Sequence, residues 1–346
     1  MTYATGLLGT GFVSESHAEG YAQSDDIELV AIADIDEEQL VEAGEKWSIP
    51  ESSQYADHHE MIAAEDLDAL SVTTPSFLHH DHVVDAAQAA NAPDVIWCEK
   101  PIALNVADAQ AMLDACAEAG TELVINHMRR FSESYTALRE MIDDGFLGDL
   151  DSVTSQFPRE LLRNGTHTLD LIYYLLGETG VSVTGSLTGD HGMPDHVESA
   201  APGEYDDCGG NGTVNMTDGT YVSLDHTSPR AHSATSFHLV GSEGRLHIDD
   251  GGEWTYWRLE ETETRYGKSV ETPLPEPLTV EDGDLFAAGA RHIADLLDGS
   301  VENRSPGSEA IDVLEMLIAM FISHHTGARV SIPLSGPLRT TEVFSW

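Results

Sequence analysis

The sequence predicts an α/β protein in two parts: a doubly wound parallel sheet over residues 1–126 and an α+β domain with a large, mostly antiparallel sheet over residues 127–346. Strand-like and helix-like segments alternate through the first part, which is typical of a parallel sheet with helices on both faces. A glycine turn directly follows the first strand. Beyond residue 131, segments with period-two alternation and glycine-containing turns replace this pattern. The length suffices for two separate cores.

In the first part, apolar runs end at turns and are followed by helical patterns. The first strand begins at Gly6 and runs into the glycine turn. We expect further strands at 28–33, 67–73, 94–98 and 122–126, and helices at 15–24, 36–46, 57–64, 79–91 and 106–120. In a parallel sheet of this kind, ligands bind outside the carboxyl ends of the strands.

The second part opens with a helix at 133–144. We expect strands at 150–157, 181–187, 212–216, 220–227, 236–240, 245–248 and 254–259, helices at 166–176, 284–297 and 308–324, and a short strand at 329–333. Residues 189–211 are rich in glycine, proline and acidic residues, which predicts an exposed loop. This loop and the sheet face are the expected determinants of substrate choice.

The net charge of −45 excludes nucleic acid as a partner, because phosphate binding needs a basic face. The acidic residues are spread through the whole chain on an ordinary apolar pattern. Such a coat resembles that of cytosolic proteins from salt-accumulating halophiles, since at molar salt the Debye length is about 3 Å and self-repulsion is screened. We therefore expect a halophilic protein that loses stability in low salt.

Membrane insertion and secretion are not expected. No apolar run reaches the length of about 18 residues that a membrane span needs. The N-terminal residues lack the basic segment of a signal peptide, which favours the cytoplasm. The cysteines, Cys98, Cys116 and Cys208, have no metal-ligand spacing and are interpreted as reduced thiols.

The glycine turn has the pattern Gly9-x-Gly11-x-x-Ser14 between a strand and a helix. In a dinucleotide-binding unit the first glycine makes the tight turn and the second lets the pyrophosphate approach the backbone, while the third position packs the helix on the strand. Asp34 ends the second strand, where an acid binds the ribose hydroxyls of the adenosine. Its neighbours Ile35 and Asp36 bring no cation for a 2′-phosphate, so we predict NAD, with NADP less favoured.

Candidate site residues follow five strands of the first part, at the edge where ligands are expected. We assign to cofactor binding Gly9, Thr10, Gly11, Phe12, Val13, Asp34, Thr74, Pro75, His79, Glu99, Lys100 and Asn126. The neighbouring histidines His79, His80 and His82 invite a metal interpretation. No carboxylate or cysteine completes a ligand set with them and successive helical residues point about 100° apart, so we predict no metal site.

Lys100 is one of only three lysines, with Lys46 and Lys268. A lysine presents a compact charge and can share a proton, which an arginine cannot do. It lies between Glu99 and Pro101 at the end of a predicted strand. A cis Lys100–Pro101 bond would aim its side chain into a cleft, although only about 5–6% of such bonds are cis in general.

Together these motifs resemble the glucose-fructose oxidoreductase / inositol dehydrogenase (Gfo/Idh/MocA) family. The resemblance rests on residues 6–11, 33–34, 73–79, 98–104, 165–170 and 327–333, in the same order along nearly the whole chain. Its most specific element is Glu99-Lys100-Pro101. The resemblance implies a Rossmann domain followed by an α+β domain, NAD(P)-dependent oxidation or reduction of a sugar, cyclitol or related compound, and a homodimer or homotetramer assembled through the second sheet.

The resemblance also implies the catalytic pair. Lys100 would contact the nicotinamide ribose and the reacting oxygen, and His167 would be the general base. The chemistry is reasonable in itself, because histidine titrates near neutral pH and an ammonium group stabilises a developing alkoxide. We assign Lys100, Arg129, Arg163, Asn164 and His167 to substrate binding.

One position departs from the family pattern. The family often has an aspartate four residues before the catalytic histidine, where this chain has Arg163 followed by Asn164. Asn164 is therefore a candidate for orienting substrate hydroxyls. Arg163 would bind an anionic group such as a carboxylate or a nucleotide-sugar phosphate, or it forms a salt bridge with one of the many acids. The substrate choices that stay open are a free sugar, a cyclitol, a sugar acid and a nucleotide sugar.

Two other functions fit the same fold. One is a non-catalytic dinucleotide sensor, which need not keep Lys100 or His167. The other is an NAD-dependent glycosidase, in which bound NAD oxidises and then re-reduces the sugar. The joint presence of Lys100 and His167 favours a dehydrogenase over a sensor.

Overall fold

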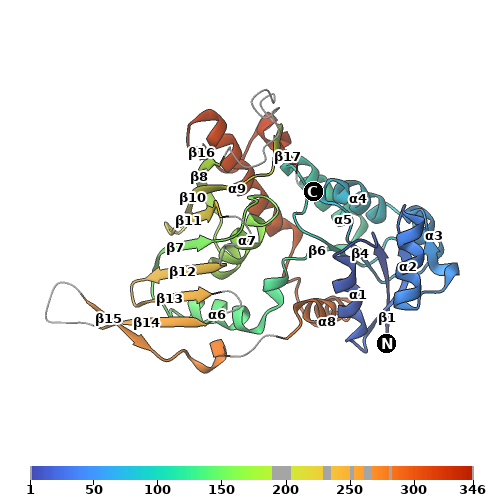
Figure 1. The fold of residues 1–346 in the computed structure, drawn as a ribbon, viewed down its shortest axis with the longest axis horizontal. Helices are drawn as coiled ribbons and strands as arrows, with labels where there is room; N and C mark the ends of the chain where they lie inside the picture. The colour runs from blue at the N-terminus through green and yellow to red at the C-terminus, as the bar shows by residue number, and fades with distance from the viewer. Residues whose placement is uncertain are drawn as a thin grey trace. The chain divides into compact units, whose positions relative to one another are not determined.

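The computed structural model describes residues 2–188, 204–228, 235–249, 253–260, 267–279 and 283–344 (Figure 1). The chain forms two compact units, each with its own sheet. The first comprises Met1–Ser132 and Asp282–Ile311, and the second comprises Glu133–Glu281 and Asp312–Ser345. The sequence predicted a domain boundary after residue 126. In the structure the first unit extends to Ser132 and also includes residues 282–311, which come late in the chain.

A six-stranded parallel sheet forms the first unit, in the order β3-β2-β1-β4-β5-β6. Its strands are β1 (Tyr3–Leu8), β2 (Ile27–Ala33), β3 (Gln54–Tyr55), β4 (Ala69–Val72), β5 (Val95–Cys98) and β6 (Glu122–Ile125). From β1 the chain adds β2 and β3 on one side of the sheet and then β4, β5 and β6 on the other side. This is the doubly wound arrangement of a dinucleotide-binding sheet. The predicted fold class of this part is confirmed.

Five helices connect these strands, and three of them begin at a capping side chain. They are α1 (Ser14–Ala22), α2 (Glu37–Trp47), α3 (His58–Ala64), α4 (His79–Ala87) and α5 (Val106–Ala119). Asp36, Asp57 and Asn105 accept hydrogen bonds from the first backbone N–H groups of α2, α3 and α5. The predicted helix at 79–91 was too long at its C-terminal end, since α4 stops at Ala87.

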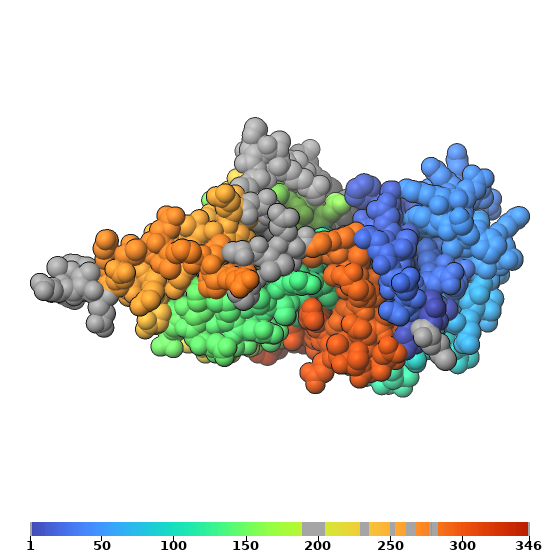
Figure 2. Space-filling view, turned by 90° about the horizontal axis from the view of Figure 1, so that it is seen from below, coloured from blue at the N-terminus to red at the C-terminus, as the bar shows by residue number. Residues whose placement is uncertain are grey.

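Helix α8 (Leu285–Leu297) belongs to the first unit although it follows most of the second in sequence. It packs against α1, and Figure 2 shows the two lying side by side, α8 in orange and α1 in blue. A Cβ at Gly289 would lie 2.7 Å from the Trp97 ring, so this glycine lets α8 approach β5 closely. Ile293 of α8 packs with Trp97, Tyr21 and Phe131 in one buried core.

The second unit contains a nine-stranded sheet in the order β15-β14-β13-β12-β7-β11-β10-β8-β16. Its strands are β7 (Leu150–Gln156), β8 (Gly180–Leu187), β10 (Gly210–Met216), β11 (Tyr221–His226), β12 (Ser236–Gly241), β13 (Gly244–Asp249), β14 (Trp254–Glu260), β15 (Lys268–Thr272) and β16 (Val330–Ser331). Every pairing except β7 with β11 is antiparallel, which confirms the predicted sheet.

The two faces of this sheet differ in polarity. One face carries buried apolar side chains such as Val153, Leu224 and Phe237. The opposite face carries partly exposed polar side chains, including Thr184 and Thr213, whose hydroxyl oxygens lie 2.6 Å apart. The unit also holds α6 (Glu133–Asp143), α7 (Gly165–Leu176) and most of α9 (Gly307–Thr326).

The loop expected at 189–211 needs a correction. Residues 204–206 form strand β9 (Glu204–Asp206), which pairs with β17 (Glu342–Phe344), and β10 already begins at Gly210. Cys208, between them, is buried. Residues 189–203 lie outside the described part of the chain. Strand β15 was also not predicted, because its residues lack a regular alternation.

Among the described residues, no helix is long and apolar enough to cross a membrane.

Candidate cofactor and substrate sites

The predicted site residues fall into two groups, one in each unit. In the first unit, the turn after β1 brings the backbone close to β4. Gly9 has φ of +92°, and a Cβ there would lie 2.8 Å from Thr74 Cγ2. A larger residue would therefore be both strained and blocked. Among the described residues, nothing lies within 4 Å of a Cβ built at Gly11, so the space over this glycine is open there.

Asp34 is held against this turn. Its Oδ2 accepts hydrogen bonds from Thr10 N at 2.6 Å and from Thr10 Oγ1 at 2.9 Å, and its Oδ1 accepts one from Asp36 N at 2.8 Å. Thr10 was predicted from the glycine pattern and Asp34 from the end of β2, and the structure joins the two by hydrogen bonds. Asp34 remains partly exposed, so its carboxylate is accessible next to the turn.

Two large apolar side chains stand in solvent beside these residues. Phe12 is 98% exposed and Ile35 is 91% exposed. Phe12 follows Gly11, and Ile35 follows Asp34. Large apolar groups at such exposure are candidates for contact with a ligand. The predicted residue Val13 is partly buried beside Phe12.

His79 fixes two of the strand-end loops. Its ring nitrogens lie 2.9 Å from the carbonyl oxygens of Pro101 and of Thr74, and the side chain is buried. Burial lowers the pKa of His79 below its ordinary value. The expected contact of His79 with a cofactor stays a prediction, while the structure gives it a bracing role between Thr74 and Pro101. Pro75, next to Thr74, is exposed.

Glu99 is buried directly before Lys100. Its Oε1 lies 3.0 Å from His17 Nε2 and 2.5 Å from Asn126 Nδ2, and its Oε2 lies 3.3 Å from the Lys100 backbone nitrogen. Burial acts to raise the pKa of Glu99, but the hydrogen bond and electrostatic attraction of His17, the charge of Lys100 and the hydrogen bond from Asn126 outweigh it and lower this pKa to about 2. Glu99 is therefore an ionised carboxylate inside the protein.

Lys100 itself is half-buried, and its peptide bond to Pro101 is cis. Asn126, predicted as a cofactor residue, contacts Glu99 through its amide nitrogen. Its Oδ1 is buried and makes no hydrogen bond in the described part of the chain. A buried amide oxygen without a donor is a candidate acceptor for a ligand N–H group.

The two arginines after β6 have different environments. Arg130 is buried and donates to Glu309 and to the carbonyl of Arg304, so it is a structural residue of the first unit. Arg129 is partly exposed, which is compatible with its predicted role in substrate binding.

In the second unit, His167 lies on the first turn of α7 and is partly exposed. Its ring stacks on Phe157 at a centroid distance of 6.3 Å, and Phe157 stacks in turn on His226 at 5.6 Å. His226 is fully buried, and burial lowers its pKa to about 4. A column of three rings thus supports the predicted base.

The segment before α7 is anchored by an acid that sequence reasoning missed. Asp207 accepts hydrogen bonds from Leu162 N and Arg163 N, both at 2.8 Å. Asn164 donates its side-chain amide to the Arg159 carbonyl. Arg163 and Asn164 are both partly exposed, and their predicted contacts with a substrate stay predictions.

Four supporting residues were not singled out from the sequence: His17, Phe157, Asp207 and His226. Their partners are distant in sequence, as with His17 and Glu99, which are 82 residues apart. A buried histidine has no sequence pattern that distinguishes it from an exposed one. Only the position of His17 on the helix that follows the glycine turn was a usable signal.

Histidines gather elsewhere in the first unit. Among the described residues, Asp57, His58 and His59 have possible ligand atoms within 4.8 Å of one another. These side chains have protein partners: Asp57 caps α3, and His58 Nε2 lies 3.1 Å from Asp85 Oδ2. His82, from the predicted histidine group, bonds Thr74 Oγ1 through Nδ1 at 2.9 Å, and His80 bonds Asp81.

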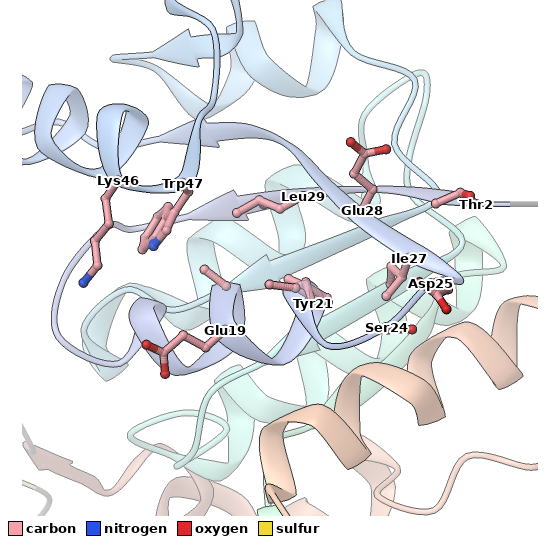
Figure 3. Close-up of a pocket in the computed structure, with 12 residues that line it drawn as sticks. Thr2, Glu19, Tyr21, Ser24, Asp25, Ile27, Glu28, Leu29, Lys46 and Trp47 are labelled. Atoms are coloured by element: carbon pink, nitrogen blue, oxygen red, sulfur yellow. The ribbon is translucent and has the colours of Figure 1, made fainter.

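A groove of about 570 Å³ lies on the first unit, away from the carboxyl ends of its strands. Figure 3 shows Lys46 and Trp47 of α2 facing Glu19 and Tyr21 of α1 across it. It borders Ile27, Glu28 and Leu29, at the beginning of β2, whereas Asp34 follows the end of that strand. The groove is therefore separate from the glycine turn.

The first unit has the sheet order and glycine turn typical of dinucleotide-binding folds, and comparison with known proteins matches the same residues. Residues 4–127 match the model of the GFO_IDH_MocA family, described as an oxidoreductase family with an NAD-binding Rossmann fold. The predicted Rossmann fold is thereby confirmed for the first part of the chain, which resembles the Gfo/Idh/MocA oxidoreductases over residues 4–127.

Similar proteins cover most of the chain. The chain is 28% identical to D-apiose dehydrogenase from Paraburkholderia graminis, over 94% of this chain and 88% of that protein. It is 26% identical to myo-inositol 2-dehydrogenase from Thermotoga maritima, over 81% and 92%. The fold resembles that of the WlbA dehydrogenase from Bordetella pertussis, solved with NADH and UDP-GlcNAcA, with a TM-score of 0.78, 22% identity and coverage of 97% and 100%.

Proposed function

We propose that this protein is an NAD-dependent oxidoreductase that transfers hydride between the nicotinamide and a CH–OH group of a sugar, cyclitol or related polyhydroxy compound. One observation carries the proposal: the open turn at Gly11, the Asp34 carboxylate and Lys100 all follow C-termini of strands in one parallel sheet. Ligands bind at that edge in sheets of this type. The related dehydrogenases named above act on apiose and inositol, which favours a polyhydroxy substrate.

The residues of the first unit fit NAD. The open space over Gly11 suits a pyrophosphate, and the Asp34 carboxylate suits the ribose hydroxyls. Asn126 Oδ1 offers a buried acceptor, and Phe12 and Ile35 offer apolar surface. Ile35 and Asp36 supply no cation for a 2′-phosphate, so NAD is favoured over NADP. Thr10, Val13, Thr74 and Pro75 complete this set.

In the proposed reaction, bound NAD supplies the hydride acceptor. His167 takes the hydroxyl proton, because an alcohol must lose its proton as its C–H bond is cleaved. Lys100, as an ammonium ion, stabilises the oxygen that becomes negative. The Phe157–His226 stack orients the His167 ring, and Asp207 orients the turn that carries Arg163 and Asn164.

Arg163, Asn164 and Arg129 are proposed to select the substrate. Two cations in a chain of net charge −45 favour a substrate with an anionic group, such as a sugar acid or a nucleotide sugar. Free sugars and cyclitols remain in the substrate class because Asn164 can bond hydroxyl groups.

A substrate screen tests the proposal. Sugars, cyclitols, sugar acids and nucleotide sugars are mixed with the enzyme and NAD in molar KCl, and NADH absorbance is followed. At least one class is expected to yield NADH, and the same substrate with NADP is expected to react more slowly. No NADH from any class, with NAD shown to bind, would favour the sensor function instead.

Variants test the roles of the catalytic pair. Lys100→Ala and His167→Ala are each expected to lower turnover by about 10²–10⁴-fold while NAD still binds, since general base and electrostatic contributions have that size. Lys268→Ala and His80→Ala, which change exposed or partly exposed residues of the same types, serve as matched controls. Wild-type turnover in either catalytic variant would remove that residue from the mechanism.

We also propose that copies of the chain associate through the partly exposed polar face of the nine-stranded sheet. A dimer or tetramer is expected by light scattering in molar KCl, and a monomer under those conditions would contradict this. A cytoplasmic location is proposed because all three cysteines are buried free thiols.

The halophilic character is proposed from the charge of −45. The melting temperature is expected to rise between millimolar and molar KCl because added salt screens the self-repulsion. A melting temperature that does not change with KCl would contradict it.

A further inference from the structure

A cluster of two histidines and an aspartate joins α3 to α4 in the first unit. His58 and His59 are the first two residues of α3, and Asp85 lies on α4. Asp85 Oδ2 lies 3.1 Å from His58 Nε2 and 3.6 Å from His59 Nε2. The two imidazole rings are close together, with centroids 4.0 Å apart. One carboxylate oxygen therefore faces the outer nitrogens of two histidines.

These separations are close to those between the ligand atoms of one metal ion. Zinc binds histidine nitrogen at about 2.0–2.1 Å and carboxylate oxygen at about 2.0–2.2 Å, so its tetrahedral ligand atoms lie about 3.4 Å apart. The two distances to Asp85 Oδ2 fall on either side of this value. The longer one, 3.6 Å to His59, is beyond hydrogen-bond length, so a hydrogen bond to Asp85 does not explain the orientation of that ring.

Asp57 supports the two histidines from the other side. Its Oδ1 accepts a hydrogen bond from His59 N at 2.9 Å and lies 3.8 Å from His58 Nδ1. In metal-binding histidines, the nitrogen that does not bind the metal usually faces a carboxylate, a carbonyl or water, which fixes the ring orientation. Asp57 has that place beside His58. Its carboxylate therefore fits a positioning role, while that of Asp85 fits the role of a ligand.

The ligand types indicate which ion fits. Two imidazoles with one carboxylate favour zinc, nickel or copper, whereas magnesium and calcium prefer oxygen ligands. The side chains are 15% exposed at His58, 59% at His59 and 38% at Asp85, so an ion can reach them from solvent and water can complete its coordination. The net charge of −45 attracts cations to the protein surface.

We propose that His58 Nε2, His59 Nε2 and Asp85 Oδ2 form a surface site for a divalent transition-metal ion such as Zn²⁺, with Asp57 as a positioning residue. The ion links the beginning of α3 to α4, because its ligands come from both helices. None of these four residues is assigned above to the cofactor or the substrate, so the site does not depend on the proposed function.

The position of the site gives it a structural role. His82 of α4 packs its ring on that of His58 at a centroid distance of 4.8 Å, and its Nδ1 lies 2.9 Å from Thr74 Oγ1. An ion that fixes His58 therefore also restricts the side chain that contacts Thr74. Bound zinc is expected to slow amide hydrogen exchange in α3 and α4 and to leave α6 of the second unit unchanged. Equal exchange in α3 and α4 with and without zinc would overturn the linking role.

A zinc titration of the whole chain tests the site directly. The protein is first treated with a chelator and then studied at pH 7.5 in molar KCl. By calorimetry it is expected to bind zinc saturably in the micromolar range. Its melting temperature should rise with zinc, because an ion that binds only the folded state stabilises it, and should stay unchanged with the same concentration of magnesium. No saturable zinc binding, or an equal rise with magnesium, would overturn the proposal.

Variants identify the ligands. His59→Gln and Asp85→Asn are each expected to weaken zinc binding about tenfold or more. Both change partly exposed side chains, and circular dichroism checks that the variants fold. His80→Gln is the matched control, because His80 also pairs with an aspartate, Asp81, at 2.7 Å on the same helix as Asp85. It should bind zinc as wild type does, and a loss in His80→Gln without one in His59→Gln would contradict the assignment.

Two further results examine the ligand set. Asp57→Asn keeps an oxygen to cap α3 and is expected to weaken zinc binding less than Asp85→Asn does, and the reverse order would overturn the assignment of Asp85 as ligand. X-ray absorption at the zinc edge is expected to show two imidazoles for each zinc, and zinc with none would overturn the site. These measurements use neither NAD nor a substrate, so their failure leaves the proposed function untouched.

Discussion

Among the described residues, two histidines are fully buried, His17 in the first unit and His226 in the second, and their environments are opposite. Both are 0% exposed. Both ring nitrogens of His17 have polar side-chain partners, Ser71 and Glu99. His226 has one partner, the Pro158 carbonyl at 3.2 Å, and its Nε2 makes no hydrogen bond in the described part of the chain.

This difference shows two ways of supporting a proposed site residue. His17 acts through directed hydrogen bonds that end on the charged residue before Lys100. His226 acts through ring contact, since it supports Phe157 and thereby His167. A polar chain depends on every donor and acceptor, whereas a ring stack depends mainly on shape. The two supports should therefore respond differently to the same substitution.

His17→Phe is expected to have the largest effect on stability. It removes a hydrogen-bond donor from the buried Glu99 carboxylate and a hydrogen-bond partner from Ser71, so the free energy of unfolding should fall by about 3 kcal/mol or more. Urea unfolding in molar KCl measures this. His17→Gln, which keeps one donor and one acceptor, should lose less. A His17→Phe protein as stable as wild type would contradict the view that His17 acts through its hydrogen bonds and His226 through ring contact.

His226→Phe is expected to show a smaller effect that depends on pH. The pKa of His226 is lowered to about 4 in the folded protein, so between pH 6.5 and 4 the unfolded chain binds a proton that the folded chain does not. The histidine therefore destabilises the fold as pH falls through this range. From about pH 7.5 to pH 5, wild type should lose about 2 kcal/mol relative to His226→Phe.

This prediction is measured as a difference between the two proteins, because other groups titrate equally in both. Unfolding curves at the two pH values, in the same KCl concentration, provide it. A constant difference in unfolding free energy across the range would show that His226 is not buried in its neutral form.

Asp207→Ala is expected to have the smallest effect of the three. Asp207 accepts from two backbone N–H groups before α7, and the loss of such a cap costs about 1 kcal/mol. Asp207→Asn keeps an oxygen acceptor and should lose less. A thermal melt of both variants tests the order, and an Asp207→Asn variant less stable than Asp207→Ala would contradict the capping role.

The parts of the fold that the sequence predicted are those determined by local pattern. The glycine turn, Asp34 and the alternation of β1 to β6 with their helices follow from residues close together in the chain. The return of α8 to the first unit and the parallel pairing of β7 with β11 were not predictable, because tertiary packing decides them. Strand β9 was missed because its pairing partner β17 is far along the chain.

The candidate site shows the same limit. Lys100 and His167 were predicted from motifs, and Thr10 and Asp34 from the known spacing of a dinucleotide site; all four stay predictions as site residues. The supports of these residues were not found, because a hydrogen bond between His17 and Glu99 or a stack of Phe157 on His226 leaves no periodic trace in the sequence. Glu99 was predicted to bind the cofactor, a contact that stays a prediction, and its observed partners are His17 and Asn126.

The central claim is that the chain oxidises a polyhydroxy substrate with net transfer of hydride to NAD. The most direct measurement is the ratio of NADH formed to substrate consumed, in molar KCl, for the substrate found by the screen. The account predicts one NADH for each molecule oxidised. Substrate cleaved with no net NADH would identify a redox-neutral glycosidase and contradict the account.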